Sequence, residues 1–475
     1  MTDVQYDLIV LGAGPVGENV ADYATQASLK CVIVESELVG GDCSFWACIP
    51  SKALLRPPSA RDAARRVAGA REAVTGPLDV AAVLARRDEF VSNWDDAGSL
   101  PWLEGAGIDL VRGHGRLAGE RRVEVTTADG DTVVLTARHA VAVCTGSAAL
   151  IPNIPGLADA NPWTSRDATS VKDVPASLAI IGGGVVAAEM ATAFVALGSE
   201  VTVIARSGLL AGLEDIAGDA VTKRLRADGA TVLHGSPVGV SRGGAGDVTI
   251  ELDSGETVTA TEVLVATGRT PRSADIGLER IGLTPGEWLT VDDSLRVDGV
   301  DGGWLYAAGD VNHRALLTHQ GKYQGRAAGM AIAARVTAPT TEADPWSDLA
   351  ASADHERVPS VVFSEPQVAS IGLTADAAAK AGYRTRVVDY DLGAVSGSGL
   401  HADGYEGAAR MVVDEDRGVA LGVTFVGADV AELLHAATIA VVGEVPLSRL
   451  WHAVPAFPTM SEIWLRLLET YRAGE

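Results

Sequence analysis

Residues 40–55 read GGDCSFWACIPSKALL, and the rest of the chain is organised around this stretch. Cys43 and Cys48 stand five residues apart in it. Residues five apart in a regular helix have Cα atoms roughly 8–9 Å apart, whereas a disulfide tolerates at most about 7 Å. If the two cysteines bond, the backbone between them is therefore not regular helix. Glycines before the pair and Pro50 after it supply a break, and residues 51–55 are predicted to be helical. Two unrelated thiols in a turn would look the same, so the flanking sequence has to decide.

Composition excludes several classes of protein. The 475 residues, 47% of them hydrophobic and 53 of them glycine, fit a globular α/β protein of more than one domain. The excess of 62 acidic over 38 basic residues argues against nucleic acid and against an anionic membrane as partners. Cys31 and Cys144 lie in apolar runs and are expected to be buried. With four cysteines, no signal-peptide pattern and no apolar run of membrane-spanning length, we expect a cytoplasmic protein.

A dinucleotide-binding pattern precedes the cysteines. Residues 6–20, YDLIVLGAGPVGENV, place Gly12, Gly14 and Gly17 between a short apolar strand and a helix, and the next strand ends at Glu35. Glycines in this context allow a tight turn, close approach to a pyrophosphate and helix–strand packing, while the acid binds ribose hydroxyls. The pattern predicts an ADP-containing cofactor without a 2′-phosphate.

A second copy of this pattern follows in residues 178–193, LAIIGGGVVAAEMATA, with Gly182, Gly184 and Ala187 in the three positions. In the first copy the acid comes 23 residues after the first glycine, and the same count here reaches Ala205, next to Arg206. The second site thus lacks the acid and offers a guanidinium that suits a 2′-phosphate. We predict NADPH in preference to NADH, the alternative being that Arg206 is a solvated charge at a strand end.

Two further regions show organisation without a chemical motif. Residues 56–105 are rich in Ala and Arg with apolar residues at helical spacing, which predicts helices and no chemistry. From Val358 the pattern changes to strands and amphipathic helices, which predicts a separate α+β domain.

Together these features resemble the pyridine nucleotide-disulfide oxidoreductases over essentially the whole chain. Beyond the two glycine patterns and the cysteine stretch, the resemblance rests on ATGR at 266–269, AAGD at 307–310, FSEP at 363–366 and FPTMSE at 457–462. It implies an α/β fold with two Rossmann-like domains, FAD in the first and NAD(P)H in the second, and a C-terminal α+β dimerisation domain of a homodimer. The implied boundaries are FAD-binding domain 1–155 and 286–350, NAD(P)H-binding domain 156–285 and interface domain 351–475.

The resemblance also implies roles for single residues. Cys48 would be the charge-transfer thiolate against the flavin, and Cys43 the thiol that meets the substrate. Lys52 would approach the flavin and pair with Glu189, unless it is an ordinary surface lysine; a helix start and this lysine would together favour a thiolate. No metal site is expected. Glu462 belongs to the C-terminal motif, and the remaining expected cofactor contacts are Gly12, Gly14, Gly17, Glu35, Gly41, Asp42, Gly115, Thr145, Gly146, Gly182, Gly184, Ala187, Arg206, Gly268, Arg269, Gly309, Asp310, Leu317 and Thr318.

The chain departs from the family at its far end. Disulfide reductases of this family carry a histidine before Pro-Thr, where it acts as the acid–base group for the thiols. The matching position here is Phe457. His452 could replace it only through a rearranged loop, and is otherwise an interface residue. The bulky pair Phe45-Trp46 also suggests altered access to Cys43.

The named relatives divide on these features. Mercuric reductase also lacks the histidine but uses a C-terminal cysteine pair, whereas this chain ends in LETYRAGE. Soluble transhydrogenases usually lack the second cysteine, whereas Cys48 is present here. We predict an FAD-dependent, NADPH-preferring oxidoreductase that reduces a disulfide with easily leaving thiols, or a similar electrophile, through Cys43 and Cys48. The alternatives are direct transfer from flavin to a quinone or dye, transhydrogenase-like activity, and a nucleotide-sensing scaffold with little turnover.

Overall fold

The computed structural model describes residues 3–244 and 246–474. The chain divides into two compact units, each built from several stretches of sequence. The first unit comprises Met1–Pro50, Asp88–Ala149 and Arg269–His355. The second comprises Ser51–Arg87, Leu150–Gly268 and Glu356–Glu475. Each unit is described by itself.

The first unit is built on a mixed sheet with the strand order β3-β2-β1-β6-β5-β4, and β16 pairs with β6 as well. Strands β1, β2, β3, β6 and β16 pair in parallel, whereas β5 and β4 continue as an antiparallel extension. β7 and β15 form a separate antiparallel pair. The strands are β1 (Asp3–Leu11), β2 (Cys31–Glu35), β3 (Asp109–Arg112), β4 (His114–Leu117), β5 (Arg122–Thr126), β6 (Thr132–Val143), β7 (Ser147–Ala149), β15 (Arg269–Pro271) and β16 (Leu305–Ala307).

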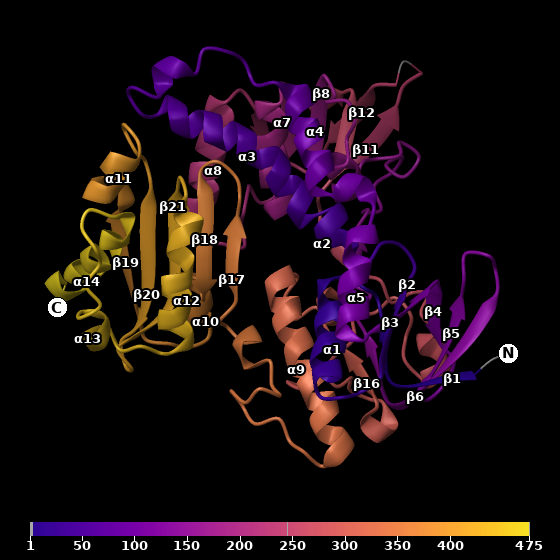
Figure 1. Cartoon of the computed structure of the whole chain (residues 1–475). Coiled ribbons are helices and arrows are strands. Elements are labelled where there is room, and N and C mark those ends of the chain that lie inside the picture. The colour runs from indigo at the N-terminus through magenta and orange to yellow at the C-terminus, as the bar shows by residue number, and fades with distance from the viewer. Residues whose placement is uncertain (1–2, 245, 475) are drawn as a thin grey trace. The chain divides into compact units, whose positions relative to one another are not determined.

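Two long helices of this unit lie side by side (Figure 1), α1 (Pro15–Gln26) and α9 (Thr318–Thr337). Their contact depends on glycines spaced four apart on α9. A Cβ at Gly325 would lie 2.8 Å from the Val16 carbonyl oxygen, and one at Gly329 would lie 2.7 Å from that of Val20. The two backbones therefore touch, which fixes α9 against the helix that follows the first glycine loop. The shorter helices are α2 (Gly41–Phe45) and α5 (Leu100–Ala106).

The second unit contains the other dinucleotide-binding sheet. Its strands pair in parallel in the order β10-β9-β8-β14, and β11, β12 and β13 form an antiparallel sheet. The strands are β8 (Ser177–Ile181), β9 (Glu200–Ile204), β10 (Thr231–Leu233), β11 (Pro237–Arg242), β12 (Val248–Leu252), β13 (Thr257–Ala260) and β14 (Glu262–Val265). The helices are α6 (Ser165–Thr169), α7 (Val185–Ala196) and α8 (Asp215–Ala227), together with α3 (Cys48–Arg65) and α4 (Val80–Phe90), each of which has one end in the first unit.

The C-terminal part of this unit is the α+β region expected from Val358 onward. An antiparallel sheet has the order β17-β18-β21-β20-β19, with α12 packed on β18 and β21 and α14 on β19 and β20 (Figure 1). The strands are β17 (Pro359–Val362), β18 (Gln367–Gly372), β19 (Thr385–Asp391), β20 (Ala408–Asp414) and β21 (Val419–Gly427). The helices are α10 (Ala375–Lys380), α11 (Ser396–His401), α12 (Leu434–Val442), α13 (Leu447–Leu450) and α14 (Ile463–Ala473).

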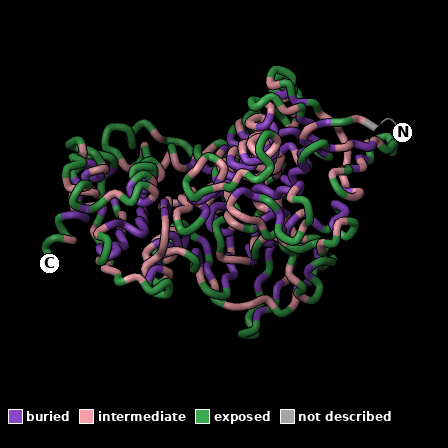
Figure 2. Tube along the Cα trace, turned by 90° about the horizontal axis from the view of Figure 1, so that it is seen from below, coloured by how far each residue is buried: buried purple, intermediate pink, exposed green. Residues whose placement is uncertain are grey.

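The fold agrees with the α/β class predicted from the two glycine patterns. Parallel strands such as β2 and β8 are buried along almost their whole length, as expected for strands covered on both faces. Figure 2 shows buried residues gathered inside each part and exposed residues along the connecting segments. Within the described residues, no helix is both long enough and apolar enough to cross a membrane.

Candidate functional site

The first glycine loop connects β1 to α1 and requires glycine at two positions, Gly12 and Gly17. Gly12 has φ +104°, and a Cβ there would lie 2.5 Å from the carbonyl oxygen of Cys144 at the end of β6. A Cβ at Gly17 would lie 1.9 Å from the Gly12 oxygen. Gly14 is the residue before α1, so the loop presents the start of that helix, where unpaired backbone N–H groups attract a phosphate.

Glu35 ends β2 beside this loop, as the spacing predicts. One of its carboxylate oxygens accepts the Ala13 N–H at 2.6 Å, and the other accepts the Glu37 N–H at 2.7 Å. Burial raises the pKa of the Glu35 carboxyl, and these backbone hydrogen bonds oppose that rise. The acid therefore holds the loop in shape through its hydrogen bond to Ala13.

The cysteine stretch packs directly on the loop. A Cβ at Gly41 would lie 2.8 Å from the Gly14 Cα, so the stretch and the loop touch through their backbones. Cys43 lies in α2 and Cys48 is the first residue of α3, so the helix is interrupted between them. The expected interruption exists, but it falls at Trp46-Ala47 rather than before and after the pair.

The reason for this difference is the position of Pro50. A proline in the first turn of a helix gives up no hydrogen bond, so α3 can begin two residues before it and run through the predicted helix 51–55. The expected effect of Phe45-Trp46 on access to Cys43 stays a prediction. Phe45 is buried, so Trp46 is the half-exposed member of the pair.

Cys48 meets a second helix start. Its Sγ lies 3.2 Å from the hydroxyl oxygen of Thr318, the first residue of α9, and the two share a hydrogen bond. Leu317 directly precedes this helix, so the positive ends of α3 and α9 both lie near the Cys48 sulfur. By contrast, burial raises the pKa of the Cys31 thiol to about 11 and that of Cys144 to about 12. These two thiols are buried, as expected, and neither is a reactive thiolate at neutral pH.

The motifs AAGD and ATGR come together through Ser147. The Ser147 hydroxyl donates to Asp310, and the Arg269 guanidinium donates to that hydroxyl oxygen at 2.8 Å and to the Ser147 carbonyl at 2.8 Å. Arg269 also lies 3.8 Å from the Asp42 carboxylate. The neighbouring Thr145 hydroxyl is buried and has no hydrogen-bond partner among the described residues, which leaves a polar atom available to a bound group.

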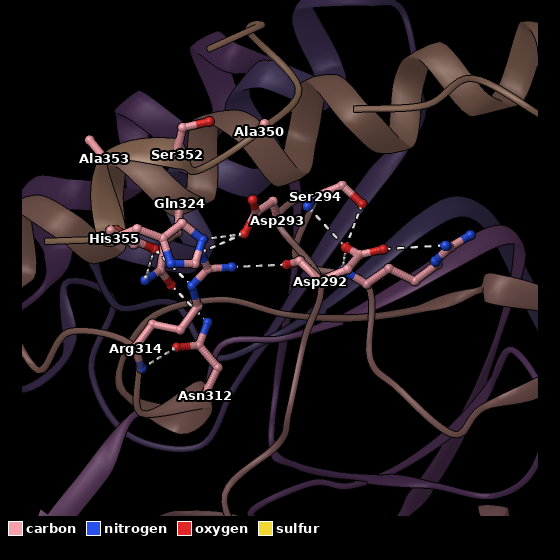
Figure 3. A network of polar contacts seen from close by, with 12 residues as sticks. Asp292, Asp293, Ser294, Asn312, Arg314, Gln324, Ala350, Ser352, Ala353 and His355 are labelled. Carbon is pink, nitrogen blue, oxygen red and sulfur yellow. Dashed lines mark hydrogen bonds and ion pairs between the residues drawn. The ribbon is translucent and has the colours of Figure 1, made fainter. Parts of the chain in front are cut away.

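Behind the AAGD turn lies a buried polar network that the sequence did not reveal (Figure 3). The Gly309 N–H donates to the Gln324 side-chain oxygen at 2.7 Å, and the Gln324 amide donates to Asp354 at 2.9 Å. Gln320 donates to the other Asp354 oxygen at 2.8 Å. Arg314 lies 3.3 Å from Asp354, so this buried carboxylate is fully paired. The network fixes Gly309, whose φ of +83° turns the chain into Asp310.

The outer part of the network is charged. Arg314 donates to Asp293 at 2.8 Å, and His355 lies 2.7 Å from the same carboxylate (Figure 3). These two partners hold the pKa of Asp293 below its usual range, although burial opposes the shift. Arg314, which precedes α9, is thereby held between two carboxylates, and it joins the last stretch of the first unit to the segment around Asp293.

In the second unit, Lys52 and Glu189 lie together as the resemblance implies. The Lys52 ammonium lies 2.8 Å from one oxygen of Glu189, which is buried in α7. The other Glu189 oxygen accepts the Phe363 N–H at 3.0 Å, and the ammonium lies 4.9 Å from the centre of the Phe363 ring. The motif FSEP therefore supports the ion pair from a distant part of the sequence.

The second glycine loop connects β8 to α7 and is crowded at Gly182 but open at Gly184. Gly182 has φ +131°, and a Cβ there would lie 2.2 Å from the Ala266 oxygen, whereas a Cβ at Gly184 would meet open space. Ala187 is buried in α7. Arg206 is exposed just after β9 and makes no hydrogen bond or ion pair with another described residue.

The C-terminal motif lacks an acid–base group at the expected place. Phe457 is 74% exposed, and His452 is exposed on a neighbouring turn. Glu462 is buried, and one of its oxygens lies 2.5 Å from Arg466. The other oxygen is buried and has no hydrogen-bond partner among the described residues. Glu462 therefore pairs with Arg466 and has no imidazole partner among the described residues.

Two expected contacts lie apart from these clusters. Gly115 is in β4, where a Cβ would lie 2.9 Å from Leu11 at the end of β1, so its small size serves packing against the first sheet. Gly268 has φ +143° and is exposed where the chain leaves the second unit.

Comparison with known proteins agrees with this arrangement. The pattern of the pyridine nucleotide-disulphide oxidoreductase family matches residues 6–328, and that of the dimerisation domain of the same family matches residues 358–467. Dihydrolipoyl dehydrogenases of Chlorobaculum tepidum and Thermus scotoductus are 32% and 33% identical, each match covering 96% of this chain and 95% of the relative. The mercuric reductase of Staphylococcus aureus is 28% identical, over 97% of this chain and 81% of its own.

Solved structures show the same fold. The HOCl-induced flavoprotein disulfide reductase RclA of Escherichia coli, solved as a Cu(II) complex, superimposes with a TM-score of 0.83 at 21% identity over 99% of both chains. LpdA of Mycobacterium tuberculosis gives a TM-score of 0.80 at 24% identity, over 99% of this chain and 100% of its own. With both family patterns matched in order and relatives similar along almost the entire length, the chain belongs to the pyridine nucleotide-disulphide oxidoreductases, a family of FAD-dependent enzymes that use a nicotinamide nucleotide.

Proposed function

We propose that this protein is an FAD-dependent oxidoreductase that takes electrons from NADPH in preference to NADH and delivers them through a Cys43–Cys48 redox pair. The observation that carries the proposal is the placement of the Cys48 sulfur. It stands at the first residue of α3 and 3.2 Å from the hydroxyl of Thr318 at the first residue of α9. A thiolate is stabilised by helix N-termini and by a hydroxyl donor, so Cys48 is suited to carry negative charge.

The first unit fits FAD. The glycine loop of Gly12 and Gly17 would accept the pyrophosphate, Glu35 the adenosine ribose and Asp310 the ribityl chain, while the unpaired Thr145 hydroxyl offers a further donor. When bound, FAD accepts a hydride from the nicotinamide and supplies two electrons. In the second unit, the ion pair with Glu189 holds the Lys52 ammonium for the role that the family resemblance implies.

The domain boundaries follow from the same reasoning. We assign residues 1–155 and 286–350 to FAD binding, 156–285 to nicotinamide nucleotide binding and 351–475 to the subunit interface. The match of residues 358–467 to the family's dimerisation domain supports a homodimer.

The acceptor is proposed to be a disulfide with easily leaving thiols, or a similar electrophile. A disulfide of ordinary alkyl thiols needs a proton donor for its leaving group, and general acid–base help is worth about 10²–10⁴-fold. Phe457 cannot supply a proton, and Glu462 is paired with Arg466 instead of an imidazole. Substrates whose thiols leave without protonation lose little by this absence.

A second candidate function rests on the same lack of an acid–base residue at position 457. Electrons could pass directly from flavin to a quinone, which needs no acid–base residue in the C-terminal motif. Cys43 and Cys48 would then be bystanders to turnover.

Anaerobic titration with NADPH distinguishes the two. The redox pair predicts a two-electron-reduced form with a long-wavelength absorbance band from a Cys48 thiolate beside the flavin, and loss of disulfide reduction in Cys43→Ser. Cys31→Ser, which changes a buried thiol away from the pair, is the control and should behave as wild type. Flavin bleaching without the band, together with undiminished quinone turnover in Cys43→Ser, would reject the redox pair in favour of direct transfer.

The acceptor proposal has its own test in Phe457→His. Restoring an imidazole at this exposed position should increase kcat/KM for simple alkyl disulfides by about 10-fold or more, as expected for a recovered acid–base group. Activity with an activated aromatic disulfide should change little. Equal rates with both substrates in both enzymes would mean that the site is shaped for another class of acceptor.

A further inference from the structure

The short turn Ser92–Trp94, between α4 and α5, adopts an unusual backbone. Ser92, Asn93 and Trp94 have φ of +49°, +52° and +59° in succession. Residues with a Cβ disfavour this left-handed region, and even single instances are uncommon outside glycine and asparagine. Three in a row persist only where surrounding contacts determine them, and such strain is often found next to functional groups.

What the turn achieves is a hydrogen bond to the cysteine stretch. The Trp94 indole N–H donates to the carbonyl oxygen of Phe45 at 3.1 Å. Phe45 is the last residue of α2, and the final carbonyls of a helix have no donor within the helix. The indole therefore caps α2 at the point where the chain turns from Cys43 toward Cys48.

The residues after the turn hold the other end of α2. Asp96 accepts the Val39 N–H at 2.7 Å and an Arg112 N–H at 2.6 Å. Arg112 in turn donates to the Glu37 carbonyl at 2.9 Å. The chain is thus fixed just before Gly40. One five-residue segment, Ser92–Asp96, therefore makes hydrogen bonds to the chain on both sides of Cys43, at Val39 and at Phe45.

The two cysteines differ in how they are held. Cys48 begins a helix of 18 residues and contacts Thr318, whereas Cys43 lies on a helix of five residues. An isolated helix of that length does not hold its shape, because helix formation has a costly nucleus. A disulfide, however, tolerates only a narrow range of Cα and Cβ separations. The position of Cys43 must therefore be set from outside α2.

We propose that Trp94 and Asp96 are positioning residues that hold Cys43 where its sulfur exchanges with that of Cys48. The inference rests on the proposed redox role of the two cysteines. Reduction breaks the S–S bond with two electrons and one proton, leaving a thiol on Cys43 and a thiolate on Cys48. A loosened Cys43 meets Cys48 less often, so the disulfide becomes less favourable relative to the dithiol.

The test replaces the indole by a ring without the N–H. Holoenzyme of wild type and Trp94→Phe is equilibrated with graded ratios of reduced and oxidised dithiothreitol, in which each disulfide opened converts one reduced dithiothreitol to its cyclic disulfide. Free thiols are then alkylated, and labelling at Cys43 and Cys48 is measured by peptide mass. Trp94→Phe should lower the equilibrium constant for disulfide formation about threefold to tenfold, the range of one hydrogen bond. The upper limit corresponds to a reduction potential higher by about 30 mV.

Two further variants sharpen the result. Trp102→Phe is the matched control, because Trp102 is a partly exposed residue of α5 in the same region and should leave the equilibrium within twofold of wild type. Asp96→Asn keeps an acceptor for Val39 but weakens the ion pair with Arg112, so it should shift the equilibrium in the same direction by less.

Three outcomes decide the matter. A shift in Trp94→Phe with none in Trp102→Phe supports the inference. A lowered thermal midpoint with an unchanged thiol–disulfide equilibrium overturns it, because the turn would then serve stability alone. If wild type forms no Cys43–Cys48 disulfide at any ratio of reduced to oxidised dithiothreitol, both the proposed redox pair and the positioning role are rejected.

Discussion

In the first glycine loop a Cβ at Gly17 would lie 1.9 Å from the Gly12 oxygen, whereas the matching position of the second loop already carries the methyl group of Ala187. The two loops share a motif and connect a buried parallel strand to a helix of 12 residues. In the first loop the helix lies so close to the Gly12 oxygen that a Cβ at Gly17 has no room, whereas the second loop accommodates the Cβ of Ala187. The first loop is also held by a buried acid, Glu35, at the end of β2, whereas an exposed base, Arg206, follows the corresponding strand β9 in the second unit.

The motif sets the backbone path of each loop, whereas the charged residue at the end of the neighbouring strand differs between the two. Glu35 is bonded to two backbone N–H groups, and under the proposed function its carboxylate would disfavour a 2′-phosphate at the first site. Arg206 has no bonded partner among the described residues, so its charge is available to a ligand. Under the proposed function, the first site would hold FAD tightly and the second would exchange NADPH, and this difference between a bonded acid and an unbonded base suits those two tasks.

The largest expected effect comes from crowding the first loop. Gly17→Ala places a methyl group against the Gly12 oxygen, so either the loop or α1 must move and the pyrophosphate site is lost. We expect the FAD content of the purified protein to fall at least tenfold, measured from absorbance after release by denaturation.

The control is a glycine-to-alanine substitution at an open position of the second loop, Gly184, which corresponds to Gly14 of the first. A Cβ at Gly184 meets open space, so Gly184→Ala should fold and keep its FAD. Full FAD content in both variants would show that the helix of the first loop is free to retreat and that the contrast between the loops is not functional.

The next effect concerns nucleotide choice. Arg206→Ala should raise the KM for NADPH about 10–100-fold, the range of charge-assisted hydrogen bonds to a phosphate, and change that for NADH less than twofold. Initial rates with each nucleotide measure the split. Because Arg206 is exposed and contacts no other described residue, the variant should keep its fold and FAD. Equal effects on both nucleotides would remove the case for a 2′-phosphate site.

The sequence predicted the parts of the site that lie within short motifs. The glycine loops, Glu35 and the interruption between the cysteines follow from local rules of helix, turn and spacing. The pairing of Lys52 with Glu189 came only from the family resemblance, because 137 residues separate them. Local pattern carries no information on which distant residues meet.

What the sequence missed has the same physical cause. Residues 56–105 showed a helical pattern, and nothing local indicates that Trp94 reaches Phe45, 49 residues earlier. Propensity argues against three successive left-handed residues, so the turn Ser92–Trp94 could not be foreseen. The support of Gly309 by Gln324 and Asp354 likewise depends on buried polar partners from separate elements.

The smallest expected effect is on the pH dependence of stability, and it concerns the residue that follows the third glycine position of each motif. The first copy has Glu18 there, and the second has Ala188. Burial raises the pKa of the Glu18 carboxyl to about 7, with Lys322 opposing the rise and Glu35 adding to it. In the unfolded chain this carboxyl titrates near its ordinary value of 4.5. The folded state therefore binds the extra proton between these pH values, and stability is lost as pH rises through about 7.

Glu18→Gln removes that dependence because its side chain stays neutral. Allowing for partial exposure, the variant should be more stable than wild type by about 1–2 kcal/mol above pH 7, and the difference should vanish below pH 4.5. Thermal midpoints of both proteins across this range measure it, and other titrations cancel in the difference. A difference that stays constant with pH would mean that Glu18 remains ionised in the fold and that Lys322, rather than burial, governs its charge.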